Sequence, residues 1–139
     1  SDSLTIDASV FVNAFSPTET GSEQSWRFLA QIMDAETPVF VPTLMLVEVV
    51  ASLARKQNNT SLALDWMEKI QQLNFLTFIP LDDGLAEEAA EIAASHRLRG
   101  SDAVYVAVAR RFAAALVTLD SEQAGRAESL VPVRLPRAE

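Results

Sequence analysis

Two short apolar stretches of this chain each end at an aspartate. Asp7 closes the stretch 4–7, and Asp120 follows the stretch 116–119. Both stretches predict buried parallel strands, and open α/β sheets bind their ligands outside the carboxyl ends of such strands. For either aspartate alone, a helix cap or a turn is a sufficient explanation.

Two further acids change that balance. Glu48 lies in an apolar helical pattern, with Leu44, Met45, Ala51 and Ser52 as its neighbours one turn away. An ionised carboxylate on such a helix is costly unless a positive charge meets it, and a bound ion is a more direct partner than Arg55. Asp102 opens a late helix, a place where the helix dipole favours an acid in any protein. One site at which all four acids meet explains them together.

The chemistry of such a site follows from its ligands. Four carboxylates without histidine, cysteine or lysine are hard oxygen donors, which suit Mg²⁺ or Mn²⁺ better than zinc or copper. Divalent ions held by acidic side chains are a recognised means of hydrolysing a phosphodiester bond. Without a cation the four carboxylates repel one another, so we expect their protonation to be favoured in the metal-free protein.

The elements that position these acids are predicted from hydrophobic periodicity. Gly100 is predicted to end one helix, and Ser101 or Asp102 to cap the next. Short apolar strands that alternate with helices predict an α/β three-layer sandwich, with a mostly parallel, roughly five-stranded sheet flanked by helices. We expect strands at 4–7, 39–41, 75–79, 116–119 and 131–135, and helices at 26–34, 42–56, 62–73, 85–98 and 101–114.

Composition limits the class of protein. The 139 residues are 49% hydrophobic and include no cysteine. We therefore expect a single domain over residues 1–139, without disulfides, thiolate metal sites or a cysteine nucleophile. The longest uninterrupted apolar run, 103–109, is far short of the roughly 20 residues that span a bilayer. These features favour a soluble, cytoplasmic protein with no membrane partner.

The net charge of −8 argues against a broad basic surface for nucleic acid. Two considerations weaken that argument, because a bound metal neutralises part of the acid and a local basic cluster remains. The cluster comprises Arg97, Arg99, Arg110 and Arg111.

Other candidates for chemistry are weaker. His96, the only histidine, stands near a predicted helix end and is interpreted as a structural or surface residue. Trp26 and Trp66 lie on amphipathic helices, which favours core or dimer surface over a platform for stacking bases. No glycine-rich phosphate loop or Gly-x-Ser-x-Gly elbow is present. Three glutamates are interpreted as a solvated helix face: Glu87, Glu88 and Glu91.

In this order and spacing, the four acidic segments give the chain a resemblance to a known family. It resembles the PIN-domain nucleases, and within them the small single-domain toxins of VapBC-type toxin–antitoxin pairs. The resemblance extends over essentially the whole chain. The segments that carry it are Asp7-Ala8-Ser9, Leu46-Val47-Glu48, Gly100-Ser101-Asp102-Ala103 and Leu116-Val117-Thr118-Leu119-Asp120.

The resemblance implies an activity and a site. It implies metal-dependent endonucleolytic cleavage of RNA, a homodimer, and a small cognate antitoxin that inhibits the enzyme by occupying the active-site groove. Ser9 and Thr118 match polar residues that support the acids. The segment 121–127 departs from many relatives because it lacks an aromatic residue. The residues that match the acidic metal-binding and catalytic quartet are Asp7, Glu48, Asp102 and Asp120.

Substrate contacts and alternative functions stay open. Arg97 and Arg99 precede the helix of Asp102 and are candidates for contacts to RNA phosphates, with a solvated loop as an equal alternative. The chain is alternatively an acidic phosphotransfer or phosphatase module, although such a module normally needs a lysine near its acids and only Lys56 and Lys69 are present. A PIN-like domain kept only for protein interaction is the third possibility.

Overall fold

The computed structural model of the protein describes residues 3–138, whose five parallel strands form one sheet in the order β3-β2-β1-β4-β5. The predicted fold class is confirmed, and the sheet is parallel throughout rather than mostly parallel. The strands are β1 (Leu4–Ile6), β2 (Val39–Pro42), β3 (Leu76–Ile79), β4 (Ala115–Val117) and β5 (Val133–Arg134).

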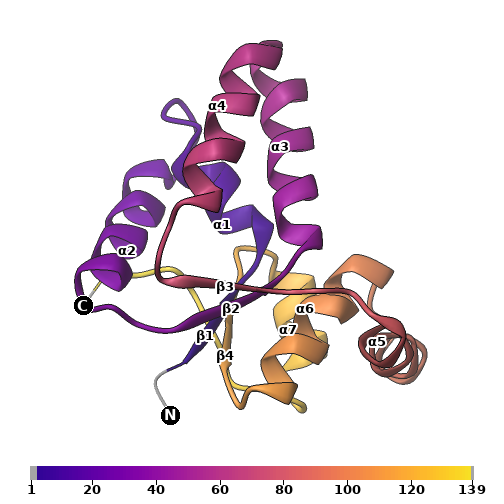
Figure 1. The fold of residues 1–139 in the computed structure, drawn as a ribbon. Helices are drawn as coiled ribbons and strands as arrows, with labels where there is room; N and C mark the ends of the chain where they lie inside the picture. Colours follow the sequence, from indigo (N-terminus) through magenta and orange to yellow (C-terminus); the bar gives the residue numbers. More distant parts are fainter. Residues whose placement is uncertain (1–2, 139) are drawn as a thin grey trace.

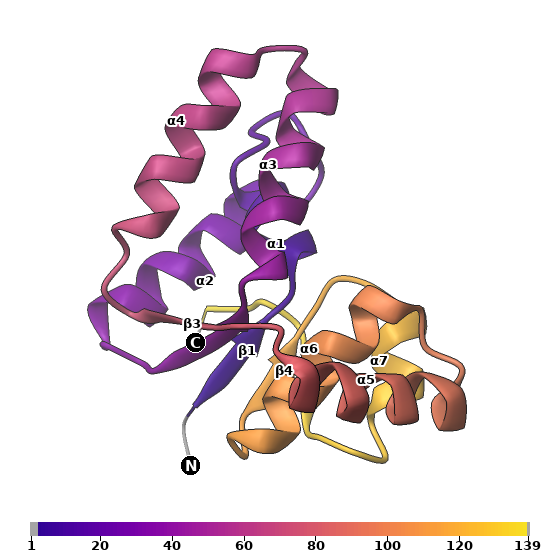
Figure 2. The same cartoon turned by 45° about the vertical axis from the view of Figure 1, so that its right-hand side comes forward.

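Helices cover both faces of the sheet, which gives the three layers. Figures 1 and 2 show α1 to α4 on one side of the strands and α5 to α7 on the other. The helices are α1 (Ala8–Ala14), α2 (Ser22–Asp34), α3 (Leu44–Gln57), α4 (Thr60–Gln71), α5 (Asp83–His96), α6 (Gly100–Arg111) and α7 (Ser121–Ala127).

The strand order places β1 at the centre, between β2 and β4. The chain proceeds from β1 to β2 and β3 in one direction, and then returns to place β4 on the other side of β1. In open parallel sheets the crevice at such a reversal, beyond the carboxyl ends of the strands, is where ligands bind. Asp7 follows β1 and Asp120 follows β4, so the reversal brings the two strand-end aspartates to one place.

The core is densest around α6. Every residue from Asp102 to Ala109 is buried, as expected of a helix that is apolar on all sides and must be covered all round. The sheet covers one side of α6, and α5 packs against another. The apolar run 103–109 is therefore the centre of the domain, and it fixes the first turn of α6 firmly against the sheet.

The boundaries around α6 differ from the prediction. Gly100 does not end the preceding helix; it is the first residue of α6, and Arg99 rather than Ser101 or Asp102 stands at the N-cap position. The left-handed residue after α5 is Arg97, with φ of 57°. Leu98, in the link between the two helices, is buried. The link therefore consists of a buried leucine flanked by Arg97 and Arg99.

Other helix starts were missed or misplaced. The helices expected at 26–34, 62–73 and 85–98 begin earlier, at Ser22, Thr60 and Asp83. The helix expected at 42–56 begins at Leu44, because Pro42 still pairs with Ile79 in the sheet. The short helices α1 and α7 were not predicted as segments, since seven residues are too few to show a helical period. Both begin directly after a strand-end aspartate, so Asp7 and Asp120 are helix caps as well.

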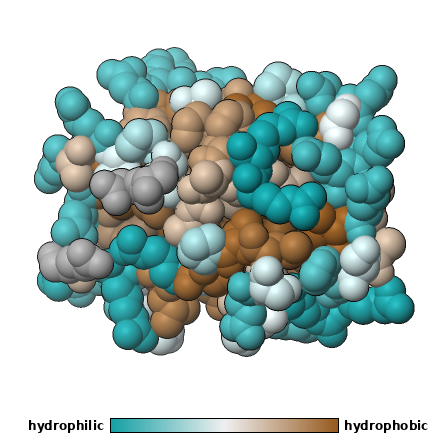
Figure 3. Space-filling view, turned by 90° about the horizontal axis from the view of Figure 1, so that it is seen from below, coloured by the Kyte–Doolittle hydropathy of each residue, from teal (hydrophilic) through white to brown (hydrophobic). Residues whose placement is uncertain are grey.

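The underside of the molecule in Figure 1 carries a hydrophobic patch. Seen from below, hydrophobic side chains cross the middle of this face inside a hydrophilic surround (Figure 3). The four acids line a pocket beyond the carboxyl ends of β1 and β4. No helix between residues 3 and 138 has the length and hydrophobicity needed to cross a membrane.

Candidate active site

Asp7 is a buried carboxylate at the point where β1 passes into α1. Its side chain is the N-cap of α1, and Oδ2 accepts hydrogen bonds from Ser9 Oγ at 2.7 Å and from Thr118 Oγ1 at 3.1 Å. Aspartate is among the residues that cap helices best, because its oxygen accepts from otherwise unpaired backbone N–H groups. Hydroxyl donors satisfy the carboxylate, but no cation contacts it among residues 3–138.

The two hydroxyl groups also tie the end of β4 to the start of α1. Ser9 Oγ accepts from the backbone N–H of Leu119 at 3.2 Å, and Thr118 Oγ1 accepts from that of Asp120 at 3.0 Å. Thr118 Oγ1 is also 2.9 Å from Gln123 Oε1. A threonine hydroxyl has one proton, so Asp7 and Gln123 share a single donor. Ser9 and Thr118 therefore hold Asp7 in place.

Glu48 lies on α3, half-buried, and its carboxylate meets a side chain from α6. Oε1 accepts a hydrogen bond of 2.6 Å from the hydroxyl of Tyr105. Burial raises the pKa of Glu48 above its ordinary value; the Tyr105 hydrogen bond opposes this shift, and the charges of Asp7 and Asp102 add to it. These effects place three of the four acids within electrostatic reach of one another.

Asp102 and Asp120 are joined by one arginine. Arg99 Nε donates to Asp102 Oδ2 at 3.0 Å, and its Nη2 donates to Asp120 Oδ2 at 2.7 Å. The other oxygen of Asp120 caps α7 through the backbone N–H groups of Glu122 and Gln123. Burial raises the pKa of Asp102, and the hydrogen bond and charge of Arg99 oppose that shift.

All four predicted acids line one pocket of about 620 Å³. Ser9 also lines it, and Thr118 lies directly behind Asp7. Lys56 in the same pocket is paired with Glu19 at 2.5 Å. The charged residues of this acidic pocket are Asp7, Glu19, Glu48, Asp102, Asp120, Arg55, Lys56 and Arg99. Five acids and three bases leave a surplus of negative charge in this pocket. Asp7 and Glu48 are its two acids without an ion-pair partner among the described residues.

The donor set fits Mg²⁺ or Mn²⁺ in its chemistry, because the converging ligands are carboxylate oxygens. The arrangement is a separate matter. Between residues 3 and 138, no group of three acidic or histidine side chains is placed to hold an ion as it stands. Arg99 occupies the space between Asp102 and Asp120 with its guanidinium, and its side chain is 75% exposed. A divalent cation would have to take over the role of this arginine.

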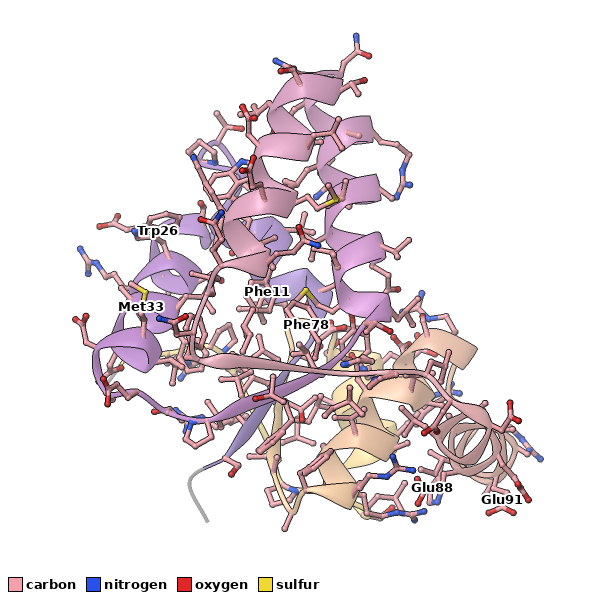
Figure 4. The ribbon with its side chains drawn as sticks, in the orientation of Figure 1. Phe11, Trp26, Met33, Phe78, Glu88 and Glu91 are labelled. Carbon is pink, nitrogen blue, oxygen red and sulfur yellow. The ribbon has the colours of Figure 1, made fainter. Side chains whose placement is uncertain are left out.

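The other predicted residues lie apart from the acidic pocket. Arg97 is not among its lining residues; its side chain donates to the carbonyl oxygen of Ala94 instead. Glu88, expected to be solvated, pairs with Arg111 at 2.8 Å. Figure 4 shows Glu88 and Glu91 on α5, at the opposite end of the molecule from Trp26 and Met33.

Two residues near the acids were not predicted from the sequence. Tyr105 had a usable signal, because it is the chain's only tyrosine, lies one helical turn after Asp102, and a buried phenol normally has a hydrogen-bond partner. Gln123, buried behind Thr118, had none, since a glutamine in a short polar segment resembles any surface residue.

A second, apolar groove of about 510 Å³ lies between α1, α2 and α4. Phe15, the C-cap residue of α1, stacks on Trp66 of α4, with ring centres 3.9 Å apart, and Trp26 of α2 meets both rings edge-on. Figure 4 shows Trp26 and Met33 on the outer helix and Phe11 within. Trp66 packs against the core as expected, but Trp26 is 50% exposed and borders the groove.

Comparison with protein families gives one match that covers most of the chain. The sequence model of the family described as PIN domain matches residues 4–128. A search of curated proteins finds no match.

Several solved structures share the fold. VapC20 from Mycobacterium tuberculosis, described as a sarcin-ricin loop cleaving toxin, is 18% identical with a TM-score of 0.76, over 94% of this chain and 98% of that chain. A chain of VapBC2 from Rickettsia felis, bound to a DNA fragment from its promoter, is 12% identical with a TM-score of 0.72, over 96% and 98%. FitAcB from Neisseria gonorrhoeae is 20% identical with a TM-score of 0.71, over 96% and 97%.

Proposed function

The chain belongs to the PIN-domain family, and from this premise we propose that it is a metal-dependent endoribonuclease, the toxin of a toxin–antitoxin pair. The observation that carries the proposal is the acidic pocket, where Asp7, Glu48, Asp102 and Asp120 arrive from four different elements. Structural roles account for the caps at Asp7 and Asp120. They do not account for Glu48, a half-buried acid with a raised pKa on an apolar helix.

We assign the four carboxylates as ligands of Mg²⁺ or Mn²⁺. When bound, such a cation supplies Lewis acidity towards a phosphodiester and lowers the pKa of a coordinated water. The protein's part is to bind and orient. Thr118 and Ser9 hold Asp7 by hydrogen bonds, and α6 presents Asp102 from its buried first turn. Arg99, once released from the two aspartates, is placed to contact a substrate phosphate.

The test is cleavage of RNA by the purified protein. We expect cleavage of single-stranded or loop RNA with Mg²⁺ or Mn²⁺ and none in excess EDTA, because base pairing hides the target bases and the cation is required. The products should carry 5′-phosphate and 3′-hydroxyl ends, since water rather than the ribose 2′-hydroxyl attacks. Undiminished cleavage in EDTA, or 2′,3′-cyclic phosphate ends, would contradict the proposed chemistry.

Two further measurements decide between the alternative functions. Membership of the PIN family weighs against the phosphotransfer or phosphatase hypothesis. Trapping of a phosphoaspartate on this protein would support that hypothesis again. A PIN domain kept only for protein interaction would bind no Mn²⁺ in a titration. Binding of Mn²⁺ together with cleavage of RNA leaves the nuclease as the function.

We further propose a protein antitoxin as partner, seated with an amphipathic segment in the apolar groove. A chain of similar fold from Klebsiella pneumoniae belongs to a structure described as a toxin–antitoxin complex. The groove is lined almost entirely by apolar and aromatic side chains, which is the surface that an amphipathic helix recognises. We also expect a homodimer, which sedimentation of the purified protein will test.

A further inference from the structure

The hydroxyl group of Tyr105 reaches from the buried helix α6 to the carboxylate of Glu48 on α3. The two residues are 57 positions apart, and the phenol oxygen lies 2.6 Å from Glu48 Oε1. The tyrosine side chain is fully buried. Tyr105 is also one helical turn after Asp102, so a single face of α6 carries one acid of the pocket and the donor to another.

The surroundings of this contact explain why it matters. Glu48 makes no ion pair with any residue between 3 and 138, so hydrogen bonds alone fix its position. A glutamate side chain has three rotatable bonds and loses appreciable entropy when it is held in one geometry. The hydroxyl of Tyr105 is the hydrogen-bond donor that the structure gives to this carboxylate. It comes from α6, the most deeply buried helix, so the donor is held rigidly.

We propose that Tyr105 is the positioning residue for Glu48, orienting its carboxylate in the acidic pocket so that a divalent cation can bind it. Tyr105 touches neither the cation nor the RNA; it acts through Glu48. This inference rests on the proposed metal-dependent nuclease function. It goes further by assigning a metal-site role to a residue outside the acidic quartet, through a single hydrogen bond.

The substitution Tyr105→Phe tests the hydroxyl group while keeping the buried ring. We expect the dissociation constant for Mn²⁺, measured by electron paramagnetic resonance, to rise by roughly 10- to 100-fold, as when a residue that orients a metal ligand is lost elsewhere. Thr5→Val is the matched control, because Thr5 is fully buried in β1 and its hydroxyl has no hydrogen-bond partner among the described residues. Its Mn²⁺ affinity should equal that of wild type.

A second measurement uses the fact that Tyr105 is the chain's only tyrosine. Tyrosine labelled with ¹³C at Cζ gives one signal in the NMR spectrum, and that signal reports on the phenol hydrogen bond. In metal-free protein we expect it to move on Glu48→Gln, because a phenol donates more strongly to a carboxylate than to an amide. Mg²⁺ should move it in wild type as well. A structural tyrosine that only fills space would show neither shift.

The outcomes separate the inference from the function on which it rests. If wild type binds Mn²⁺ and cleaves RNA while Tyr105→Phe binds Mn²⁺ equally well, the positioning role is overturned and the nuclease function stands. If wild type binds no Mn²⁺, both are overturned. Should Tyr105→Phe fail to fold by circular dichroism, the ¹³C signal decides, and a signal unmoved by Glu48→Gln and Mg²⁺ overturns the inference.

Discussion

At Asp7 a single carboxylate caps α1 and lines the acidic pocket. The same duality holds at Asp120, which caps α7. A capping role alone would explain either aspartate. The acidic pocket adds electrostatic repulsion between carboxylates, which a helix cap does not require. The charge of Asp7 contributes to the raised pKa of both Glu48 and Asp102. A carboxylate whose pKa is raised by folding costs stability as pH rises above its unfolded value, so this residue opposes folding in the metal-free protein.

We expect metal-free Asp7→Asn to melt above metal-free wild type at neutral pH. Asparagine caps a helix as well as aspartate does. The loss of the Asp7 charge removes its electrostatic repulsion of Glu48 and Asp102. The sign follows from their raised pKa values: the cost is absent below about pH 4, where unfolded carboxyls are protonated, and grows as pH rises through the folded values. The gap in melting temperature should therefore shrink on acidification, and activity should fall by orders of magnitude.

Metal should narrow or reverse that ranking. Wild type gains RT ln(1 + [M]/Kd), about 2.7 kcal/mol at a hundredfold excess over Kd, and Asp7→Asn gains less because it binds more weakly. Thermal melts of both proteins in EDTA and in saturating Mn²⁺, at neutral and acidic pH, measure this. If Asp7→Asn lowers the metal-free melting temperature and Mn²⁺ shifts neither protein, then Asp7 is only a helix cap.

Arg99→Gln should bind Mn²⁺ more tightly than wild type and RNA less tightly. The guanidinium now holds Asp102 and Asp120, so its removal frees two ligands and deletes a phosphate contact. The metal-free melting temperature should fall somewhat at neutral pH, because the buried carboxylate of Asp102 loses its cation, whereas the more exposed pair with Asp120 contributes little. Mn²⁺ titrations, and RNA binding as a function of salt, measure the two effects.

Arg97→Gln is the matched control for Arg99→Gln, since it makes the same change in charge two residues earlier and outside the acidic pocket. The slope of log K against log salt should fall by about one for Arg99→Gln and by less for Arg97→Gln. Equal changes in the two variants would mean that the pairing of Arg99 with the aspartates has no consequence for either ligand.

Among the elements, the helices divide the surface into two kinds. The first turns of α1 and α6, with α3 between them, enclose the acidic pocket, whereas α1, α2 and α4 enclose the apolar groove. Only α1 contributes to both, with Phe11 and Phe15 on one side and Asp7 at its cap. A partner in the apolar groove would therefore lie within one short helix of the proposed metal ligands, from where it could inhibit the proposed site.

Met33→Glu should weaken binding of the proposed antitoxin by at least tenfold and leave RNA cleavage unchanged. Met33 borders the groove and is 49% exposed, so a carboxylate there is tolerated by the fold but opposes an apolar segment. Leu64→Glu is the control, because Leu64 is 48% exposed on α4 outside the groove. Titration of cleavage with purified antitoxin gives both affinities; equal loss in the two variants would place the partner elsewhere.

For the molecule as a whole, charge is the dominant feature. The chain carries a net charge of −8, and the acidic pocket adds to a field that repels RNA. The proposed nuclease function would therefore require the bound cation for substrate affinity as well as for chemistry, because the cation would offset the repulsion between an acidic protein and a polyanionic substrate.

We therefore expect weak binding of a short single-stranded RNA in EDTA, without saturation at micromolar protein. Asp7→Asn should bind the same RNA more tightly than wild type under these conditions, because one repelling charge has been removed. Fluorescence anisotropy of a labelled RNA provides the measurement. Tight, strongly salt-dependent binding by wild type in EDTA would point instead to a basic surface elsewhere on the molecule.

The sequence by itself determined the fold class, the place of the longer helices and strands, and the four acids. Each of these depends on short-range patterns: a buried strand is an apolar run, a covered helix such as α6 is apolar all round, and an acid at a strand end needs no knowledge of distant residues. The seven-residue helices α1 and α7 escaped because their pattern is shorter than two full periods. Gly100 misled because Arg97 takes the left-handed conformation that glycine usually supplies.

Tertiary structure alone decided which side chains meet. Glu48 and Tyr105 are 57 residues apart, and Thr118 and Asp7 are 111 apart; no local pattern encodes such pairs, because they depend on how α3, α6 and the ends of β1 and β4 pack. The bridge from Arg99 to Asp102 and Asp120 is of the same kind. Local sequence fixes what each residue offers, and the order of strands in the sheet decides which residue it meets.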